Sequence, residues 1–185
     1  MKDSVLSQDL PARIVRKCRV LCTFVHNSAR ATAALRRKHV EVMGVVISQA
    51  KQLVGDVKTR WNSTHLMLLR IQTLRPALEQ FMLDEAELPS TTSSWSQSKC
   101  LESNEWAMID SMVALLGPFY RFTELMCSNK MSAALAIVQM VVLKNELSNL
   151  SNYHVHRMKE HLLTELDNRF FSKNPREATG GTETV

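Results

Sequence analysis

The sequence predicts a mainly α-helical, bundle-like fold with at most one or two short strands near residues 53–61. Its 185 residues are 45% hydrophobic and 22% charged, which is typical of a folded globular chain about the size of one domain. Ten Met against five Gly and five Pro favour helices over a β-sandwich, which needs many turn residues. Apolar residues also recur three or four positions apart along several long segments, which is the spacing of one helix face.

Two helices are expected in the first quarter of the chain. Pro11 suits the first turn of a helix, where its missing N–H needs no partner, so we place the first helix from Pro11 to His26. Ser28 can cap a second helix, and Gly44 can end it. The run that follows, residues 45–54, fits neither a helical nor a strand pattern clearly.

The middle of the chain is expected to pass from a short extended piece into a helix. Residues 56–61 alternate in the manner of a short strand, and the polar run 62–64 offers capping side chains to the helix that follows. A break in that helix is predicted just before Pro76, because proline disfavours the helical conformation at the residue before it. Residues 84–103 are polar and predict a flexible surface loop.

The second half is expected to form further helices and to end in a tail. The first of these helices begins at Ser103, and Gly117-Pro118 must bend it or split it. Ser132 can cap the apolar helix that comes next. A last amphipathic helix is expected from Tyr153 to Phe171. The tail, residues 172–185, lacks apolar side chains to hold it and is predicted to be disordered.

Composition and motifs disfavour several classes of function. The longest apolar stretch, residues 131–143, is shorter than the roughly 18 residues of a membrane span, and no signal-type apolar segment follows Met1. Four cysteines are too few for a disulfide scaffold and indicate reduced thiols. The five scattered glycines form no phosphate-binding loop, and no nucleophile motif is present. These observations indicate no enzyme and no membrane association.

One predicted helix face carries three candidate metal ligands, Cys18, Cys22 and His26. At the rise of an α-helix they spread over about 12 Å, which is too far for one zinc ion. We therefore expect a buried helix face here, and we expect no metal site and no cofactor in the chain.

The net charge of +5 is unevenly distributed along the sequence. Residues 1–83 carry 14 Lys and Arg against 5 Asp and Glu, whereas residues 84–185 carry 9 against 13. The basic half is where an anionic partner would bind. Its two basic clusters are Arg13, Arg16, Lys17 and Arg19, and Arg36, Arg37 and Lys38. Each cluster fits either a solvated helix face, which is the commoner use, or a phosphate-contacting surface.

Residues 56–64, with the sequence Asp-Val-Lys-Thr-Arg-Trp-Asn-Ser-Thr, combine two cations, an indole and several hydrogen-bonding side chains. Arg60 beside Trp61 could hold a phosphate while the ring stacks on a base, as in proteins that bind unpaired DNA. Lys58 and Asn62 flank this pair and complete the candidate DNA-binding set. The alternative is that Trp61 anchors the helix in the core and that the polar residues after it are helix caps.

This string resembles a known signature. Together with residues 65–70 it is similar to the TRWNST-x-x-ML-x-R signature of hAT-superfamily transposases and of their domesticated relatives, the zinc finger BED domain-containing proteins. Downstream, Trp106 and the run 115–119 resemble the family's W…LL-x-PF stretch, and residues 158–170 resemble its MK…L…RF helix. The resemblance covers about residues 10–171.

The resemblance implies an interior fragment of an RNase H-like domain that is interrupted by a helical insertion. It implies one partial domain over residues 10–171, with the loop 84–103 inside it and the tail 172–185 beyond it. In this family the Trp of the signature lies near the DNA ends and helps to stabilise a displaced base. By resemblance, Arg60 and Trp61 are therefore the residues expected to contact DNA.

The family's metal-binding residues, two Asp and one Glu, cannot be placed in this chain. The resemblance therefore implies a non-catalytic nuclear protein that at most binds DNA or chromatin weakly. The alternative is a helical interaction module that contacts protein partners or a second copy through Met-rich faces, without binding DNA. Helices that lack the sheet of such a domain would keep an apolar face, so dependence on a partner is also expected.

Overall fold

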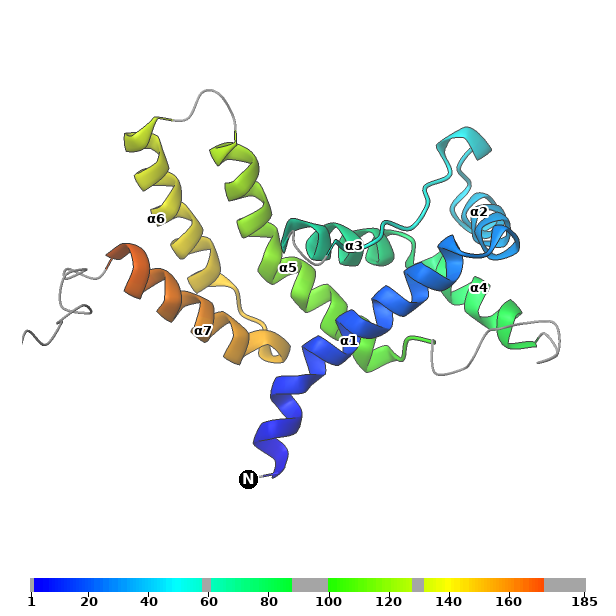
Figure 1. Ribbon diagram of the computed structural model, residues 1–185, viewed down its shortest axis with the longest axis horizontal. Helices are drawn as coiled ribbons and strands as arrows, with labels where there is room; N and C mark the ends of the chain where they lie inside the picture. Colours follow the sequence, from blue (N-terminus) through cyan, green and yellow to red (C-terminus); the bar gives the residue numbers. More distant parts are fainter. Residues whose placement is uncertain (1, 58–60, 88–99, 128–131, 172–185) are drawn as a thin grey trace, which may run out of the picture. The chain divides into compact units, whose positions relative to one another are not determined.

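The computed structural model describes residues 2–57, 61–87, 100–127 and 132–171, and of residues 2–9, 61 and 85–87 it describes the backbone only (Figure 1). The described residues form seven α-helices and no strand, which confirms the predicted mainly α fold. The α-helices are α1 (Lys2–His26), α2 (Ala29–Met43), α3 (Trp61–Thr73), α4 (Arg75–Glu87), α5 (Ser103–Met126), α6 (Ala133–Asn149) and α7 (His156–Leu166). Three short helical turns accompany them: η1 (Ile47–Gln49), η3 (Tyr153–Val155) and η4 (Asp167–Phe171).

Several helix boundaries lie where the sequence predicts them. The hydroxyl of Ser28 accepts a hydrogen bond from the amide of Ala31 at 3.2 Å and caps α2. Gly44 ends α2 with a φ of +65°, a conformation that glycine adopts without the penalty of a Cβ atom. Ser132 caps α6 in the same way as Ser28 caps α2. The predicted break before Pro76 separates α3 from α4.

Two boundaries differ from the sequence prediction, and a third settles an alternative that the sequence left open. Helix α1 begins at Lys2, so Pro11 lies inside the helix instead of in its first turn. Helix α3 begins at Trp61, so the polar run 62–64 lies in its first turn, where Ser63 and Thr64 bond to Asp56 instead of capping the helix. Helix α5 continues through Gly117-Pro118, which is one of the two predicted alternatives.

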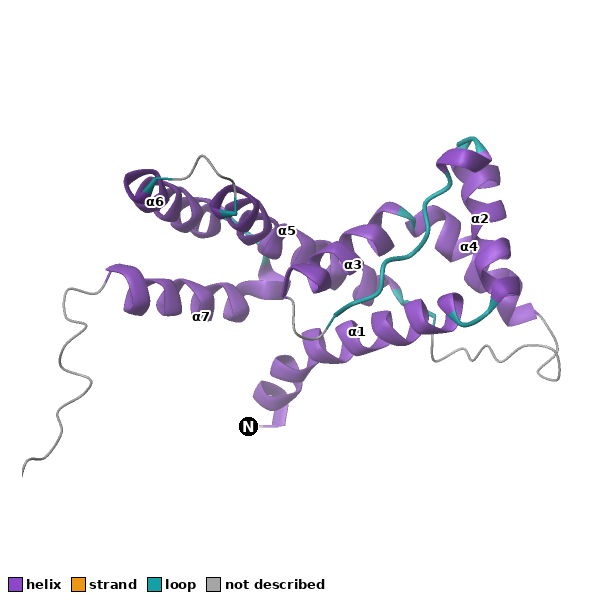
Figure 2. Cartoon of the chain, turned by 45° about the horizontal axis from the view of Figure 1, so that its top comes forward, coloured by secondary structure: helices purple, strands orange, loops and turns teal. Residues whose placement is uncertain are grey.

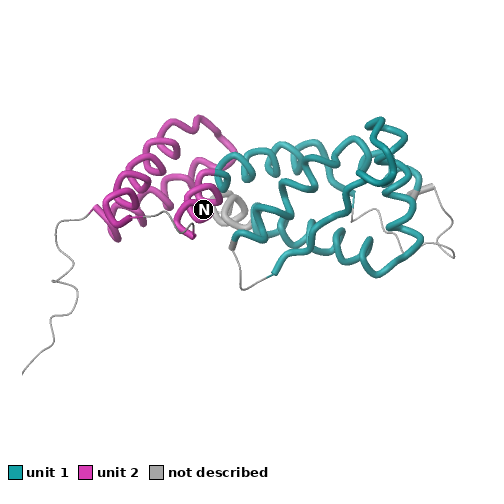
Figure 3. The backbone as a smooth tube through the Cα atoms, turned by 90° about the horizontal axis from the view of Figure 1, so that it is seen from above, with its two compact units in different colours: residues 1–117 teal, residues 118–185 magenta. Residues whose placement is uncertain are grey.

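The chain divides into two compact units, residues 1–117 (unit 1) and residues 118–185 (unit 2) (Figure 3). The sequence predicts one partial domain over residues 10–171, because it shows no linker between two cores. The boundary falls inside α5 at Gly117-Pro118, and a boundary inside a helix has no composition signal of a linker. The expected loop 84–103 begins later than predicted, because residues 84–87 belong to α4. Residues 88–99 of that loop lie outside the described residues, and the predicted tail 172–185 lies outside them too.

Unit 1 has a continuous apolar core. Helix α2 packs on α4 and α1, and α1 packs on α3. An ion pair of 2.5 Å between Lys17 and Glu105 links α1 to the start of α5. The largest fully buried side chains of the unit 1 core are those of Ile14, Leu21, Leu35, Met67, Leu68, Ile71, Leu74, Leu78, Phe81, Trp106, Ile109 and Met112. This core fixes the entrance of α3 against α1.

Unit 2 consists of the end of α5 with α6 and α7, and it buries few apolar side chains. Besides Pro118 of α5, those buried in its described part are Leu143, Leu147, Val155 and Leu166. Helix α6 leaves a row of apolar side chains exposed: Leu135, Ile137, Val138, Val141 and Val142. Among the described helices, none combines the length and apolar character needed to cross a membrane.

Candidate nucleic-acid interface

An irregular segment, residues 45–57, leads from α2 to the entrance of α3 (Figure 2). Its backbone pairs with side chains of three helices instead of with a neighbouring strand. Hydrogen bonds join Ile47 O to Arg36 Nη2 (3.0 Å), Lys51 N to His39 Nδ1 (3.0 Å), Gln52 O to Arg70 Nη1 (2.6 Å), Leu53 O to His26 Nε2 (3.0 Å) and Val54 O to Cys22 Sγ (3.5 Å). Because these bonds satisfy the backbone polar groups of an irregular segment, the segment can lie against the helices without forming a sheet.

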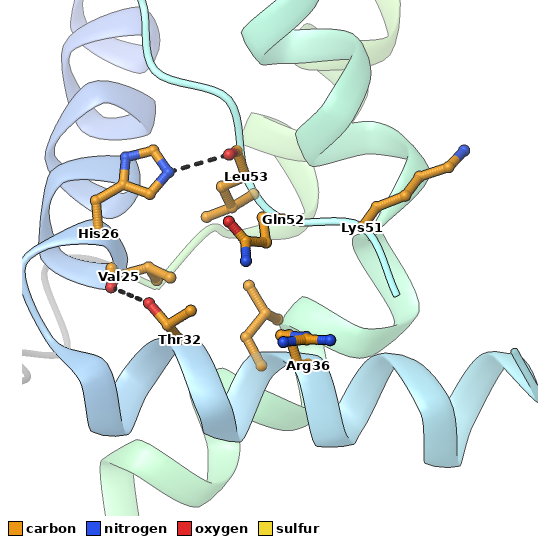
Figure 4. A pocket seen from close by; sticks show the side chains of 8 residues that line it. Val25, His26, Thr32, Arg36, Lys51, Gln52 and Leu53 are labelled. Atoms are coloured by element: carbon orange, nitrogen blue, oxygen red, sulfur yellow. Dashed lines mark hydrogen bonds between the residues drawn. The ribbon is translucent and has the colours of Figure 1, made fainter. Parts of the chain in front are cut away.

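A small pocket lies where this segment passes the end of α1 and the first half of α2 (Figure 4). Val25, Leu35 and Leu53 give it an apolar lining, and Arg36 and Gln52 add polar groups. The pocket has room for about one water molecule. It is therefore too small to hold a nucleotide or a base.

The segment ends in a buried carboxylate that joins α1 to α3. The Asp56 side chain has no exposed surface, and its Oδ2 atom lies 2.5 Å from Nε of Arg19 on α1. The other oxygen, Oδ1, accepts hydrogen bonds from the hydroxyls of Ser63 at 2.6 Å and Thr64 at 3.1 Å, both in the first turn of α3. Ser63 Oγ also accepts a 2.9 Å hydrogen bond from the amide of Val57. We call Arg19, Asp56, Val57, Ser63 and Thr64 the Asp56 cluster.

The charge of Asp56 is stabilised by its partners. Burial alone raises the pKa of the Asp56 carboxyl, but the hydrogen bonds from Ser63, Arg19 and Thr64 outweigh burial and lower its pKa below the ordinary value. Asp56 is therefore an ionised, fully engaged carboxylate at neutral pH. It links α1 to the first turn of α3, where the signature continues.

The predicted DNA-contacting residues lie directly at this cluster in the sequence. Lys58 and Arg60 are outside the described residues, and Trp61 is the first residue of α3, with its side chain outside the description. Asn62 is half-buried, and its Oδ1 atom is buried with no hydrogen-bond partner in the described part of the chain. The choice between a stacking role and a core role for Trp61 thus stays a prediction.

The first basic cluster is divided between free and paired cations. Arg13 and Arg16 are exposed on α1 and make no hydrogen bond or ion pair within the part of the chain that the structure describes. Lys17 is engaged by Glu105. Arg13 and Arg16 are therefore available to an anionic partner, whereas Lys17 holds the fold.

The second basic cluster, on α2, is largely engaged within the protein. Arg36 donates to the carbonyl of Ile47, and Arg37 lies 3.9 Å from Glu41. Lys38 contacts Asp84 at 2.9 Å and Glu41 at 3.3 Å. Hydrogen bonds to Asp84 and Glu41 raise the pKa of Lys38. These three side chains have less freedom to contact phosphates than Arg13 and Arg16.

The cysteines of α1 belong to the core, as the sequence analysis expects. Cys18 and Cys22 are buried, whereas His26 is exposed and bonded to Leu53. Burial is the main cause that raises the pKa of each thiol to about 12, so neither forms a reactive thiolate near neutral pH. Within the described ranges, no three His, Cys, Asp or Glu side chains lie close enough together to hold a metal ion.

Sequence reasoning missed the role of Arg19. The 37 positions between Arg19 and Asp56 give no local signal that the two side chains meet. The signal for Ser63 was present but pointed elsewhere, because a hydroxyl near a helix start is ordinarily a cap. The sequence did offer one hint of this contact. Asp56 precedes the predicted start of a helix, and the hydroxyl residues Ser63 and Thr64 follow it.

The elements that the structure describes in unit 1 are helices, and its third helix, α3, begins within a signature of transposase type. Together these features define the class as a transposase-related helical domain. The chain belongs to the family described as ZBED1 RNase-like helical domain, which matches residues 3–115. The match ends two residues before the boundary of unit 1, so unit 1 corresponds to the family domain. This confirms the hAT-like and zinc finger BED-like resemblance of the sequence.

Two curated relatives are similar in sequence to part of this chain. "Putative AC transposase" of Zea mays is 31% identical over 88 residues, which cover 48% of this chain and 10% of the relative. "Putative transcriptional regulator tpeD" of Talaromyces stipitatus is 31% identical over 78 residues, which cover 42% of this chain and 8% of the relative. The matches thus span a tenth or less of the length of these relatives. No solved structure matches the chain.

Proposed function

We propose that this chain is a non-catalytic, transposase-derived nuclear protein that associates with DNA or chromatin through the entrance of α3. The observation that carries the proposal is the position of Arg16. This exposed cation lies one helical turn before Arg19, and Arg19 contacts Asp56, two residues before Lys58. An exposed cation of α1 is thus one helical turn from the residue that bonds Asp56, the first residue of the signature.

Electrostatics favour a nucleic-acid partner for this region. A phosphate contact gains affinity when a cation is exposed and has no internal partner, because binding then releases counterions without breaking an ion pair. Arg13 and Arg16 meet this condition. The two relatives, named as a putative transposase and a putative transcriptional regulator, are consistent with DNA association in the nucleus.

The state of Asp56 supports the non-catalytic part of the proposal. Two-metal transposition chemistry needs carboxylates that are free to coordinate a divalent ion. Asp56 is the carboxylate of the signature, and both of its oxygens are occupied by Arg19, Ser63 and Thr64. A metal ion would have to displace the guanidinium of Arg19 to reach it.

The test of DNA association is a fluorescence anisotropy titration of a labelled hairpin with a single-stranded flank, at several salt concentrations. Affinity should fall steeply with salt, and Arg13→Ala/Arg16→Ala should reduce the salt slope by about 2. Trp61→Ala should weaken binding to the hairpin and to single strands by about tenfold or more, and duplex binding less.

The matched control is Arg121→Ala/Arg169→Ala, which removes two exposed arginines from unit 2. This variant should keep the affinity for the hairpin within about twofold of wild type. Absence of binding by the wild-type chain at low salt would reject DNA association. Equal losses for the two arginine pairs would reject the α1 surface as the contact.

A plasmid nicking assay tests the proposal that the chain is not catalytic. The purified chain is incubated with supercoiled plasmid and Mg²⁺ or Mn²⁺, and nicked product is quantified against a chelator control. We expect no nicked product above this control. Metal-dependent nicking that follows the protein through purification would overturn the non-catalytic proposal.

The second candidate function is a helical protein–protein interaction module without DNA binding. It is favoured by the exposed apolar side chains of α6, of which Ile137 is 67% exposed and Val138 is 55% exposed. The methionines expected at such a surface are divided: Met67, Met82, Met108 and Met112 are buried, whereas Met43 and Met126 are exposed. Concentration-dependent sedimentation that Ile137→Asp abolishes, combined with no DNA binding at low salt, would favour this candidate.

A further inference from the structure

The end of helix α2 and the turn that follows it carry an exposed apolar surface. Four large apolar side chains within residues 42–47 are between 38% and 58% exposed: Val42, Met43, Val46 and Ile47. We call these four residues the α2 tip. Among the described residues of unit 1, the other exposed large apolar side chains are more scattered along the chain: Val20, Val57, Leu66, Leu69 and Leu83. Grouped apolar side chains on a soluble domain mark an interaction site, whereas single ones are ordinary.

Hydrogen bonds hold the α2 tip in its exposed conformation. Gly44 ends α2 in the left-handed conformation, and its amide donates to the carbonyl of Val40 at 3.0 Å. The short turn η1 follows and packs on α2. Arg36 Nη2 donates to the carbonyl of Ile47 at 3.0 Å and so attaches η1 to the helix. Because the backbone is already ordered, a partner that binds the α2 tip loses less affinity to the entropy of ordering.

The stretch of chain around the α2 tip is basic. Residues 30–54 contain five Lys and Arg and one Glu, which gives this stretch a net charge of +4. The Arg37 side chain is 67% exposed and lies 3.9 Å from Glu41, and an exposed pair of this kind contributes little. The Lys51 side chain makes no ion pair within the described ranges, and it extends away from the other residues drawn in Figure 4. Arg37 and Lys51 are therefore available to an anionic partner.

A partner for this surface must offer apolar and negatively charged groups together. A nucleic-acid backbone supplies the charge but not the apolar surface that aliphatic side chains need. An anionic membrane supplies both, but membrane-binding surfaces typically combine aromatic side chains with a larger polybasic cluster. The α2 tip contains no aromatic residue, and Arg36 and Lys38 are bonded within the protein. An acidic amphipathic helix meets both requirements, because its apolar face lies beside its carboxylates.

We propose that the α2 tip is a docking surface for an acidic amphipathic segment of a protein partner. Apolar side chains of that segment pack on the α2 tip, and its carboxylates pair with Arg37 and Lys51. This inference goes beyond the proposed DNA association, because it involves neither the cations of α1 nor the signature residues. The two functions can therefore be tested separately.

The test is a fluorescence anisotropy titration with a labelled synthetic peptide that has Leu on one helical face and Glu on the other. A peptide of the same composition in scrambled order should bind at least about tenfold more weakly, because it has no continuous apolar face. Val46→Ser/Ile47→Ser should weaken binding of the amphipathic peptide by about tenfold or more, because it removes the two most exposed side chains of the α2 tip.

The matched control is Ile137→Ser/Val138→Ser, which removes a similarly exposed pair of the same residue types from unit 2. It should keep peptide affinity within about twofold of wild type. Equal losses for the two variants would overturn the assignment to the α2 tip. If Val46→Ser/Ile47→Ser loses its helical circular dichroism, Val42→Ser/Met43→Ser goes through the same titration with the same expected loss.

Charge reversal tests the choice of an acidic partner. Arg37→Glu/Lys51→Glu should weaken binding of the acidic peptide by about tenfold and should strengthen binding of a peptide in which Lys replaces every Glu. Equal affinity of the wild-type chain for the acidic and the basic peptide would overturn this choice. So would an absence of binding to the acidic peptide at low salt.

Two further measurements separate a protein partner from the other anionic partners. Wild type should not float with phosphatidylcholine vesicles that contain about 25% phosphatidylserine. Flotation that Val46→Ser/Ile47→Ser abolishes would assign the surface to a membrane and overturn the inference. The same variant should bind the DNA hairpin as tightly as wild type, and a loss of hairpin affinity equal to the loss of peptide affinity would also overturn it.

Discussion

Both units of this protein consist of α-helices, but the two units bury very different shares of their large apolar side chains. In unit 1, long apolar side chains such as Phe81 and Trp106 are almost fully buried. In unit 2, large apolar side chains stay exposed, with Tyr153 at 93% and Phe170 at 59%. Because apolar burial is the dominant favourable contribution to folding, unit 1 should account for most of the stability of the chain.

This difference shows that local sequence signals are enough to form helices but not enough to form an apolar core. A helix needs spacing, caps and the absence of breakers, and both units have these, with Ser28 and Ser132 as equivalent caps. A core needs several helices to meet, which α1 to α5 do in unit 1. Unit 1 also secures its irregular segment with side-chain hydrogen bonds, as at His39 and Arg70.

The largest expected effect comes from the core of unit 1. Trp106→Ala should lower the free energy of unfolding by about 3–5 kcal/mol, because it removes a side chain that is 2% exposed and that lies under Arg75 at 5.0 Å. Phe170→Ala in unit 2 should change it by less than about 0.5 kcal/mol. Urea denaturation followed by circular dichroism measures both, and similar losses would contradict the contrast between the units.

The next effect compares two ion pairs of nearly equal length. Arg19→Ala breaks the 2.5 Å pair with buried Asp56 and should cost about 3 kcal/mol, because it leaves a carboxylate without its cation inside the protein. Arg121→Ala breaks the 2.6 Å pair with Glu146 in unit 2, where both side chains are largely exposed, and should cost less than about 1 kcal/mol. The same denaturation assay applies, and a larger loss for Arg121→Ala would refute the burial argument.

The helix caps give a matched pair of smaller effects. Ser28→Ala and Ser132→Ala each remove one 3.2 Å hydrogen bond and should each cost about 1 kcal/mol locally. The location of the loss should differ: hydrogen exchange should increase in α2 for the first variant and in α6 for the second. If Ser132→Ala raised exchange across unit 1 as well, the two units would be more strongly coupled than their separate cores suggest.

The sequence predicts the helices well because their signals are local. Ser28, Gly44, Ser132 and Pro76 act on neighbouring residues, so their effects can be read without tertiary information. The start of α1 was missed, because Pro11 suits a first turn by local criteria and yet lies inside the helix.

The candidate site could be predicted only in part for the same physical reason. The signature of residues 56–64 marks the entrance of α3, and the family match supports it. The pairing of Arg19 with Asp56 depends on how α1 packs on α3, and nothing near either residue in the sequence encodes it. The engagement of Lys17 and Lys38 by distant carboxylates was hidden in the same way.

The smallest expected effect is the acid sensitivity that His39 gives to unit 1. Burial, followed by the charges of Lys51 and Arg70, lowers the pKa of His39 below its ordinary value of 6.5. The unfolded chain therefore binds the proton more readily, so this contribution to stability is complete above pH 6.5 and is lost as pH falls toward the lower folded pKa. Protonation also removes the acceptor that His39 Nδ1 offers to the Lys51 amide.

His39→Asn keeps an acceptor near this position and does not titrate. The variant should therefore show a flatter dependence of the free energy of unfolding on pH between about pH 7 and 5, in urea titrations run in parallel with wild type. The buried carboxylate of Asp56 acts in a separate, more acidic window, because its lowered pKa gives a contribution that is present above 3.8 and lost as pH falls through the folded pKa. Identical slopes for wild type and His39→Asn above pH 5 would show that His39 does not carry the loss, and the pH dependence of unit 1 would then have to come from other groups.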